Sequence, residues 1–218
     1  MPVLIRRVEE TLLTSGETDF EILIMDDDSP DGTSEAVLSL KNPRVKLINR
    51  KGRPRGLSAA VIDGLHQAQG ELIGVMDADL SHPPEVIPSL IQALREGARV
   101  AVGSRYVAGG GIKNWPFHRA LISRFACALA RPVTPVKDST SGFFFLQKKV
   151  LENVVLDPLG FKIGLEVFVK SKHEHKIKEV PYVFTDRRKG SSKFGIYVIG
   201  CYLKQIILLF KKRHFTPQ

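Results

Sequence analysis

The run Leu72-Ile73-Gly74-Val75-Met76-Asp77-Ala78-Asp79 joins a short apolar stretch directly to two carboxylates. Such a stretch predicts a strand that is buried on both faces of a sheet. Carboxylates at the exit of a buried strand are poorly placed for packing. They are well placed to hold a divalent cation and, through that cation, a diphosphate. The run therefore indicates an enzyme that uses a nucleotide-activated substrate.

Three further apolar runs lie at residues 21–25, 45–48 and 99–103. Helical patterns separate the runs, over residues 3–13, 57–68 and 86–94. Pro84 and Gly97 are typical start and stop signals for the last of these helices. The alternation predicts an α/β fold: a doubly wound, mostly parallel sheet with helices on both faces.

The chain begins with a predicted helix, at residues 3–13, rather than with a strand. A right-handed crossover needs a strand on both sides of its helix. This helix therefore resembles the second half of a unit whose first strand is absent from the sequence. We expect either a chain that is shortened at its amino end or a sheet position that something else fills.

A second acidic cluster, Asp26-Asp27-Asp28-Ser29-Pro30-Asp31-Gly32-Thr33, follows the predicted strand at residues 21–25. Ligands of open parallel sheets bind beyond the carboxyl ends of the strands, so both acidic clusters are expected to rim one crevice. A plain turn, with Asp31 or Thr33 capping the next helix, is the alternative. Three consecutive aspartates repel one another unless a cation or hydrogen-bond donors are near, which favours contact with a nucleobase or ribose.

Asp77 and Asp79 are expected to point to opposite sides of an extended segment, so that one reaches a sugar or ribose while the other meets a metal. Mg²⁺ usually takes one or two carboxylates together with phosphate oxygens. The alternative is a turn of solvated aspartates, with Ser81 capping the helix that follows Pro84.

Basic side chains are candidates for holding a second phosphate. Arg119 and Ser123 lie four residues apart on one face of a predicted helix over residues 117–130, and Arg105 follows a predicted strand. Guanidinium groups bind phosphate in a bidentate way. A solvated helix face is the alternative for each of these residues.

A basic loop, Arg187-Arg188-Lys189-Gly190-Ser191-Ser192-Lys193, precedes the last helix. It could close over two phosphates as a lid, or it could be an ordinary exposed linker.

Residues 195–210 read G-I-Y-V-I-G-C-Y-L-K-Q-I-I-L-L-F, and a basic run at 211–214 follows them. The segment is too short and too interrupted to span a bilayer. It predicts an amphipathic helix in a membrane interface, with its basic tail on anionic headgroups. A core helix, or the base of a removed transmembrane region, is the alternative. The side chains expected towards lipid are Ile199, Tyr202, Leu203, Ile206, Ile207 and Phe210.

The net charge of +9 favours an anionic partner, which could be nucleic acid, an acidic membrane surface or a phosphorylated substrate. Two cysteines in apolar helical contexts fit a reducing compartment. No secretory leader is expected, since the first residues carry charges of both signs.

Several motifs together resemble glycosyltransferase family 2, and most closely its dolichol-phosphate mannosyltransferases. They are D-D-D-S-P-D-G-T at 26–33, G-L-S-A-A-V-I-D-G at 56–64, M-D-A-D-L-S-H-P-P at 76–84, G-S-R-Y at 103–106, S-x-x-S-G-F-F across 139–144, E-V-P at 179–181 and D-R-x-x-G-x-S-K at 186–193.

The resemblance implies a GT-A fold and an inverting transfer of mannose from GDP-mannose to dolichyl or another polyprenyl phosphate. It implies Mg²⁺ or Mn²⁺ at Asp77 and Asp79, with Ser81 where some members have glutamine. It implies nucleotide-sugar contacts from Asp26, Asp27, Asp77 and Asp79. The residues implied at the acceptor phosphate are Arg105, Arg119, Ser123, Arg187 and Lys193.

The resemblance also predicts the organisation of the chain. We expect a catalytic domain over residues 1–194 and a membrane-interface helix with a basic tail over residues 195–218. The expected location is the cytoplasmic face of a membrane, as a peripheral protein, with membrane subunits as further partners. That membrane would be the endoplasmic reticulum in a eukaryote and the plasma membrane in a prokaryote. The family's opening strand, which ends in a P-x-Y-N-E-like segment, has no counterpart in this sequence.

Three other functions fit part of the pattern. A transferase of the same fold could use UDP-glucose. A basic domain that binds nucleic acid or membrane would explain the charge, but it leaves the acidic clusters unexplained, and no RNA-binding aromatic motif is present. A shortened, inactive paralogue would retain the fold without the activity.

Overall fold

The computed structural model describes residues 1–157, 161–171, 176–186 and 196–215. The strands are β1 (Ile22–Asp26), β2 (Val45–Asn49), β3 (Leu72–Val75), β4 (Val100–Ser104), β5 (Gly111–Lys113), β6 (Phe144–Gln147), β7 (Ile177–Pro181) and β8 (Val183–Thr185). The helices are α1 (Pro2–Thr14), α2 (Thr33–Leu38), α3 (Leu57–Gln67), α4 (Ile87–Arg95), α5 (Phe117–Leu129), α6 (Ile163–Lys170) and α7 (Ile196–Phe215), with 3₁₀ turns η1 (Pro84–Val86) and η2 (Lys148–Leu151).

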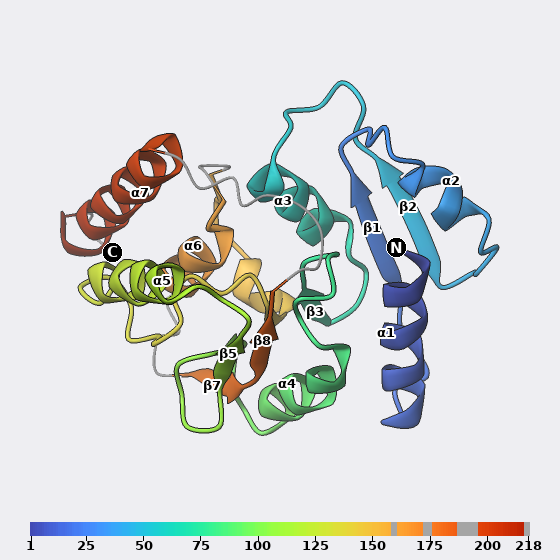
Figure 1. Cartoon of the computed structure of the whole chain (residues 1–218), viewed down its shortest axis with the longest axis horizontal. Coiled ribbons are helices and arrows are strands. Elements are labelled where there is room, and N and C mark those ends of the chain that lie inside the picture. Colours follow the sequence, from blue (N-terminus) through green and yellow to red (C-terminus); the bar gives the residue numbers. More distant parts are fainter. Residues whose placement is uncertain (158–160, 172–175, 187–195, 216–218) are drawn as a thin grey trace.

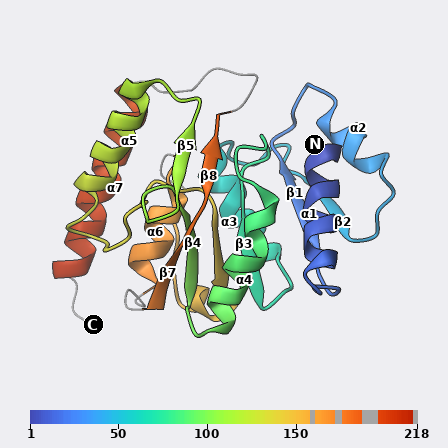
Figure 2. The ribbon, with the colours of Figure 1, turned by 60° about the horizontal axis from the view of Figure 1, so that its bottom comes forward.

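Helices cover both faces of the central strands, which gives three layers (Figures 1 and 2). Alternate residues of β4 show the division. Ala101 packs in a cluster with α1 and α4, whereas Val100 and Val102 pack in a second cluster with α3 and α6. This arrangement confirms the predicted α/β class with helices on both faces.

Strand pairing divides the sheet into separate parts. One part has the order β3-β6-β4-β7, in which β6 is antiparallel to β3 and β4 while β7 is parallel to β4. β1 and β2 form a parallel pair of their own, and β5 pairs in parallel with β8. Three of these five pairings between described strands are parallel and two are antiparallel, which agrees with the predicted mostly parallel sheet.

The apolar runs are not all buried on both faces. Every residue of β4 is buried, but residues 22–25 of β1 are only half-buried, and Leu72 of β3 is 36% exposed. No residue of β2 is fully buried. The prediction of full burial is therefore wrong for β1, β2 and β3. The physical reason is the pairing, because among the described strands β4 has a neighbour on each edge, whereas β1, β2 and β3 each pair along one edge.

The predicted signals around α4 are confirmed. Pro84 occupies the first position of η1, where its missing N–H costs nothing. Gly97 follows α4 with a φ of 103°, and the amide of Ala98 donates to the carbonyl of Ala93. This is the Schellman arrangement that ends helices at a left-handed glycine.

The last helix packs beside α5 and α6 (Figures 1 and 2). The Tyr202 hydroxyl donates to the Ala126 carbonyl of α5 at 2.8 Å, and Tyr202 and Ile206 pack against a small buried cluster around Leu165. These two side chains therefore face the protein, which corrects the expectation that they face lipid. Ile199, Leu203, Ile207 and Phe210 are exposed. Within the described ranges no helix is both long and apolar enough to cross a bilayer.

Both cysteines are free thiols. Cys127 is buried against Thr140, and Cys201 is half-buried on α7.

Candidate active site

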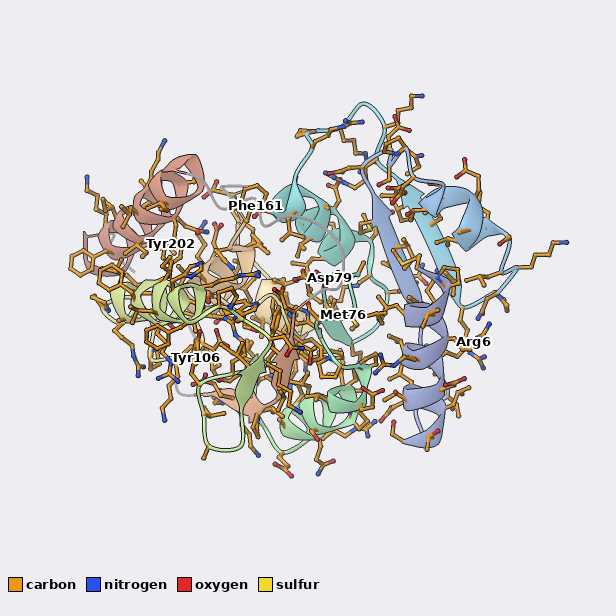
Figure 3. All side chains as sticks on the ribbon, viewed as in Figure 1. Arg6, Met76, Asp79, Tyr106, Phe161 and Tyr202 are labelled. Atoms are coloured by element: carbon orange, nitrogen blue, oxygen red, sulfur yellow. The ribbon has the colours of Figure 1, made fainter. Side chains whose placement is uncertain are left out.

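Two acidic loops follow β1 and β3. Met25 at the end of β1 and Asp77 after β3 line the same cavity, so the two loops begin at one end of it. Each loop holds one non-glycine residue in the left-handed region, Asp28 with a φ of 63° and Leu80 with a φ of 64°. Such residues cost free energy and concentrate at functional sites, so both loops are candidates for ligand contact. Figure 3 places Asp79 and Met76 near the centre of the molecule.

Asp26 is held by its own loop and by the first turn of α2. It is 3% exposed, and its two carboxylate oxygens accept hydrogen bonds from the Ser29 amide at 3.1 Å and the Ser34 hydroxyl at 2.5 Å. Burial alone would raise the pKa of Asp26, but these hydrogen bonds lower it below the usual 3.8. Asp26 thus stabilises the conformation of the loop, and its buried carboxylate is not accessible to a nucleotide.

Asp27 is more accessible, with 29% of its side chain exposed. Its carboxylate pairs with Arg50 and accepts the Gly56 amide at 2.8 Å, at the start of α3. Arg50 is buried and also binds Asp63 at 2.9 Å and the Pro54 carbonyl at 2.8 Å. Protein donors therefore offset much of the repulsion among the three aspartates.

Asp77 lies beside a buried histidine. The backbone amide of Asp77 donates to Nδ1 of His82 at 3.0 Å, which leaves the proton of the neutral ring on Nε2. Burial lowers the pKa of His82, against the charge of Asp77, so the ring stays neutral. The ring stacks on Phe143 at 5.0 Å. A Cβ on Gly142 would lie 3.4 Å from the Asp77 carboxylate, so glycine leaves room there.

Asp79 is exposed, and its Oδ1 accepts hydrogen bonds from the Ser81 amide at 3.0 Å and the Ser81 hydroxyl at 2.5 Å. Ser81 is itself 2% exposed. Ser81 thus orients the Asp79 carboxylate, and its burial argues against the metal-ligand position expected for it. In the described part of the chain no three His, Cys, Asp or Glu side chains converge. Two carboxylates with hard oxygen donors nevertheless fit Mg²⁺ or Mn²⁺ that also binds a diphosphate.

Arg105 is committed to a buried ion pair. Its Nε and Nη2 donate to the two oxygens of Asp138 at 2.7 and 2.6 Å, and Nη2 also donates to Thr140 at 2.9 Å. Burial would lower the pKa of Arg105, but Asp138 raises it above its ordinary value. With 6% of its side chain exposed, Arg105 is not open to an incoming phosphate, which corrects the expected clamp.

Of Arg105 and Arg119, the latter is the accessible arginine, with 28% of its side chain exposed. It binds Asp186 at 2.8 Å and lies over the Trp115 ring at 4.3 Å. Arg105 lies 5.4 Å from the same ring, so Trp115 brings the two arginines together. Ser123 is half-buried on α5 beside Tyr106. Burial raises the pKa of Tyr106, although the charge of Arg105 and the hydrogen bond with Ser123 act against that rise.

The structure thus assembles part of the expected site. Arg105, Arg119 and Ser123 converge around Trp115 and Tyr106, and the acidic loops flank one cavity end. Arg187 and Lys193 lie outside the described residues.

Five residues of the site carried no clear signal in the sequence. Arg50, His82, Trp115, Asp138 and Lys162 reach their partners only through the fold. Lys162, for example, donates to the Thr140 carbonyl at 3.0 Å, and burial, together with the charge of Arg105, lowers its pKa. Two of the five carried a hint, since Trp115 is the chain's single tryptophan and His82 lies in the motif at 76–84.

Comparisons with known proteins identify the family. The model of the family described as "Glycosyl transferase family 2" matches residues 2–155. A protein of Pyrococcus furiosus named dolichol-phosphate mannosyltransferase is 47% identical over 196 residues, covering 88% of this chain and 55% of its own length. Proteins of the same name from Mycosarcoma maydis and Saccharomyces cerevisiae are each 42% identical, covering 90% and 87% of this chain and 68% and 74% of their own lengths. The chain thus spans about half the length of the Pyrococcus relative.

Solved structures support the fold alone. Glucosyl-3-phosphoglycerate synthase from Mycobacterium tuberculosis, in complex with Mn²⁺, UDP and glucosyl-3-phosphoglycerate, has a TM-score of 0.64 at 17% identity. The match covers 96% of this chain and 76% of the other. The fold is therefore GT-A-like, as predicted.

Proposed function

The chain belongs to glycosyl transferase family 2, and from that premise we propose that it transfers mannose from GDP-mannose to dolichyl or another polyprenyl phosphate, with inversion at the sugar carbon. The observation that carries the proposal is the identity of 42–47% to three dolichol-phosphate mannosyltransferases over most of this chain. The two acidic loops at one end of a cavity are consistent with it.

At the donor end, Asp79 and Asp77 would hold the metal and the sugar diphosphate. Asp79 is suited to this because Ser81 fixes its carboxylate while the side chain stays exposed. Asp27 would accept hydrogen bonds from the nucleoside, since it is the accessible member of its pair with Asp26. A bound Mg²⁺ or Mn²⁺ would offset the negative charge that grows on the leaving diphosphate.

At the acceptor end, Arg119 would bind the incoming phosphate with the help of the Ser123 hydroxyl. That phosphate would compete with Asp186 for the guanidinium. Arg105 would act as a positioning residue, because it contacts Trp115 and Tyr106 while its own charge is paired with Asp138. Arg187 and Lys193 complete the proposed set.

The proposed reaction is an in-line displacement. An acceptor phosphate oxygen forms a bond to the anomeric carbon as the bond from that carbon to the diphosphate oxygen breaks. The electron pair of the broken bond leaves with the nucleoside diphosphate. Since a phosphate monoester has a second pKa of about 6, the nucleophile is already an anion near neutral pH and needs no strong general base.

We further propose that residues 1–194 are the catalytic domain and that residues 195–218 rest on the cytoplasmic face of a membrane as a peripheral contact. Ile207 and Leu203 of α7 and Phe117 and Phe125 of α5 support this, because all four are large, apolar and exposed on neighbouring helices (Figure 2). The net charge of +9 favours anionic headgroups.

Mannose transfer tests the proposal directly. The full chain would be assayed with GDP-mannose and a polyprenyl phosphate in anionic vesicles, with and without Mn²⁺. Asp79→Ala should lower turnover at least ~100-fold, since it removes charge stabilisation at the leaving group. Asp19→Asn, which changes an exposed aspartate after α1, is the matched control and should keep full turnover. Equal turnover for both variants would reject the role of Asp79.

Thermal-shift titration separates the donors. GDP-mannose should raise the unfolding midpoint in the presence of Mn²⁺, because it binds only the native state. A rise with UDP-glucose and none with GDP-mannose would reject the proposed donor in favour of the glucosyl alternative.

A further inference from the structure

Lys162 is a half-buried cation between α6 and the loop before β6, which is made of residues 138–143. Its ammonium donates to the Thr140 carbonyl at 3.0 Å. No Asp or Glu side chain of the described chain forms an ion pair with it. Since a lysine ammonium has three N–H groups, two of them have no partner in that part of the chain.

The position of Lys162 goes against the usual rules for helix ends. Lys162 is the N-cap of α6. Side chains that accept hydrogen bonds are preferred there, and the helix dipole places partial positive charge there. The lysine meets like charge, and its side chain makes no capping hydrogen bond. Because local rules are broken mainly at functional sites, the placement indicates a function for the ammonium rather than for the helix.

The backbone of Lys162 is held from two sides. Its carbonyl accepts the Leu165 amide at 3.1 Å and the Gln205 side-chain amide of α7 at 3.3 Å. Gly164 packs so closely on the loop before β6 that a Cβ there would lie 2.8 Å from the Ser141 carbonyl oxygen. The side chain of Lys162 therefore reaches towards the loop from a fixed base.

Lys162 lies where the donor end and the acceptor end of the site meet. Thr140, whose carbonyl accepts the ammonium, also accepts Nη2 of Arg105 on its hydroxyl at 2.9 Å. Two residues later, Gly142 borders the donor end, because a Cβ there would lie 3.4 Å from the Asp77 carboxylate. The charges of Arg105 and Asp77 both act on Lys162. One short loop thus connects the ammonium to both ends.

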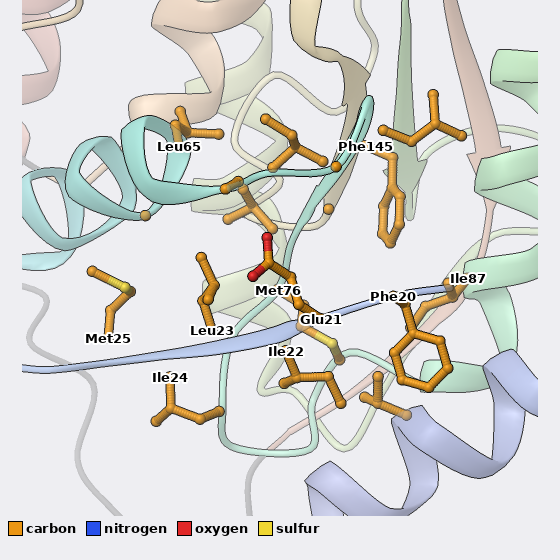
Figure 4. A pocket seen from close by; sticks show the side chains of 18 of the residues that line it. Phe20, Glu21, Ile22, Leu23, Ile24, Met25, Leu65, Met76, Ile87 and Phe145 are labelled. Atoms are coloured by element: carbon orange, nitrogen blue, oxygen red, sulfur yellow. The ribbon is translucent and has the colours of Figure 1, made fainter. Parts of the chain in front are cut away.

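The donor end has little positive charge of its own. The cavity of about 660 Å³ that the acidic loops flank is lined by apolar side chains and by carboxylates, among them Leu23, Met25 and Glu21 (Figure 4). No Lys, Arg or His side chain of the described chain lines it. A phosphate bound near Asp77 therefore needs cations from outside the cavity.

Two other basic groups of this region are not available for a phosphate. Arg105 is paired with Asp138, and His82 stays neutral because burial lowers its pKa. Burial, together with the charge of Arg105, also lowers the pKa of Lys162, although Asp77 and Asp138 act against that fall. A bound anion would favour the charged form of Lys162 further.

From this geometry we infer that the Lys162 ammonium binds a phosphate oxygen where the donor and acceptor ends meet, and that Lys162 is a further ligand-binding residue of the transferase. The inference rests on the proposed function, which brings a diphosphate and an acceptor phosphate to this site. Both groups offer an anionic oxygen to an N–H of the ammonium. A cation between them would also offset the repulsion of two anions that must approach each other.

Lys162→Met tests the inference, because methionine is also long and unbranched but has neither the charge nor the N–H groups. Lys148→Met is the matched control, since the Lys148 ammonium also donates to a backbone carbonyl, that of Ala68, at 2.7 Å. Lys148 lies at the opposite end of β3 from Asp77, where its amide donates to the Glu71 carbonyl. Lys148→Met should bind ligands and turn over like the parent chain.

Calorimetry with two probes identifies the source of the phosphate. GDP with Mn²⁺ reports on the donor end, and a short-chain prenyl phosphate reports on the acceptor end. Lys162→Met should weaken the binding of one or both probes at least ~10-fold, the usual loss for a hydrogen bond to a charged group. A loss with GDP alone assigns the donor diphosphate, and a loss with the prenyl phosphate alone assigns the acceptor. Unchanged binding of both probes would overturn the inference, even if mannose transfer had slowed.

The stability of the unliganded protein separates ligand binding from a structural role. Lys162→Met removes a half-buried charge that forms no ion pair in the described chain, so the thermal midpoint should rise or stay within about 4 °C of the parent. A larger fall that Lys148→Met does not share would show that Lys162 serves to hold Thr140 in place. That result would also refute the inference.

Failure of this inference can be told from failure of the proposed function. A parent chain that neither transfers mannose nor binds either probe would refute the proposed function, and this inference with it. A parent chain that binds both probes no better than Lys162→Met does would refute this inference alone.

Discussion

β4 and β1 have similar apolar sequences, V-A-V-G-S and I-L-I-M-D, but different surroundings. β4 lies between β6 and β7, and all five of its residues are buried. Among the described strands β1 pairs with β2 alone, and four of the five residues of β1 are half-buried. The apolar pattern of a strand thus shows which position it suits, while its actual burial depends on neighbours from distant parts of the chain.

The largest expected difference between the two regions is in their buried ion pairs. Asp138→Asn leaves the Arg105 guanidinium buried without its carboxylate, which should cost about 3–5 kcal/mol of unfolding free energy. Asp27→Asn should cost only about 1 kcal/mol, since Arg50 keeps Asp63 and the Pro54 carbonyl. Urea unfolding of both variants measures the difference. Equal losses would contradict the contrast between the regions.

Truncation of one leucine in each region gives the next largest effect. Leu146 of β6 is fully buried, so Leu146→Ala should cost about 2–5 kcal/mol. Leu23 of β1 is half-buried and already borders the cavity, so Leu23→Ala should cost only about 1 kcal/mol. The midpoints of urea unfolding report both values. A larger loss for Leu23→Ala would show that β1 is packed as tightly as the other strands.

Two glycines should respond in opposite directions. A Cβ on Gly103 of β4 would lie 2.8 Å from the Phe143 ring and 3.2 Å from its backbone oxygen, so Gly103→Ala should cost about 1–3 kcal/mol. A Cβ on Gly64 of α3 would lie 3.4 Å from the flexible side chain of Met25. Gly64→Ala should therefore stabilise the protein by about 0.5–1 kcal/mol, the usual gain for alanine in a helix. The thermal unfolding midpoint of each variant shows whether the substitution stabilises or destabilises the protein. Destabilisation by Gly64→Ala would show that the Met25 side chain cannot move to make room for the added methyl group.

The smallest effect concerns pH. The hydrogen bond from Arg50 lowers the pKa of Asp63 below the usual 3.8, so the unfolded chain binds the proton first as the pH falls. The stabilisation is present above 3.8 and is lost as the pH drops through the folded value. Asp63→Asn should therefore give a shallower fall in unfolding free energy below pH ~4 than the parent chain gives. Parallel curves of urea midpoint against pH for the two proteins would count against this.

The sequence predicted most of the elements because their signals are local. The apolar runs at 21–25, 45–48, 72–76 and 99–103 became β1 to β4, and Pro84 and Gly97 bound η1 and α4 as expected. The antiparallel insertion of β6 was not predicted, since its partners lie about 45 or 70 residues away along the chain.

The candidate site was predicted only in part, for a related reason. The acidic loops follow strands, and that position can be read from the sequence. The commitment of Arg105 to Asp138, 33 residues later, cannot be read from either residue type. A guanidinium suits a phosphate and a carboxylate equally well, so only the fold shows which one it meets.

Arg50 has a consequence for how this protein can change by mutation. One buried guanidinium pairs with Asp27 in the loop after β1 and with Asp63 on α3. The loss of either carboxylate alters what the loss of the other costs, so the two positions are expected to show epistasis. In a library that randomises both, surviving variants should carry correlated pairs, and the tolerated replacements at position 63 should depend on the residue at position 27.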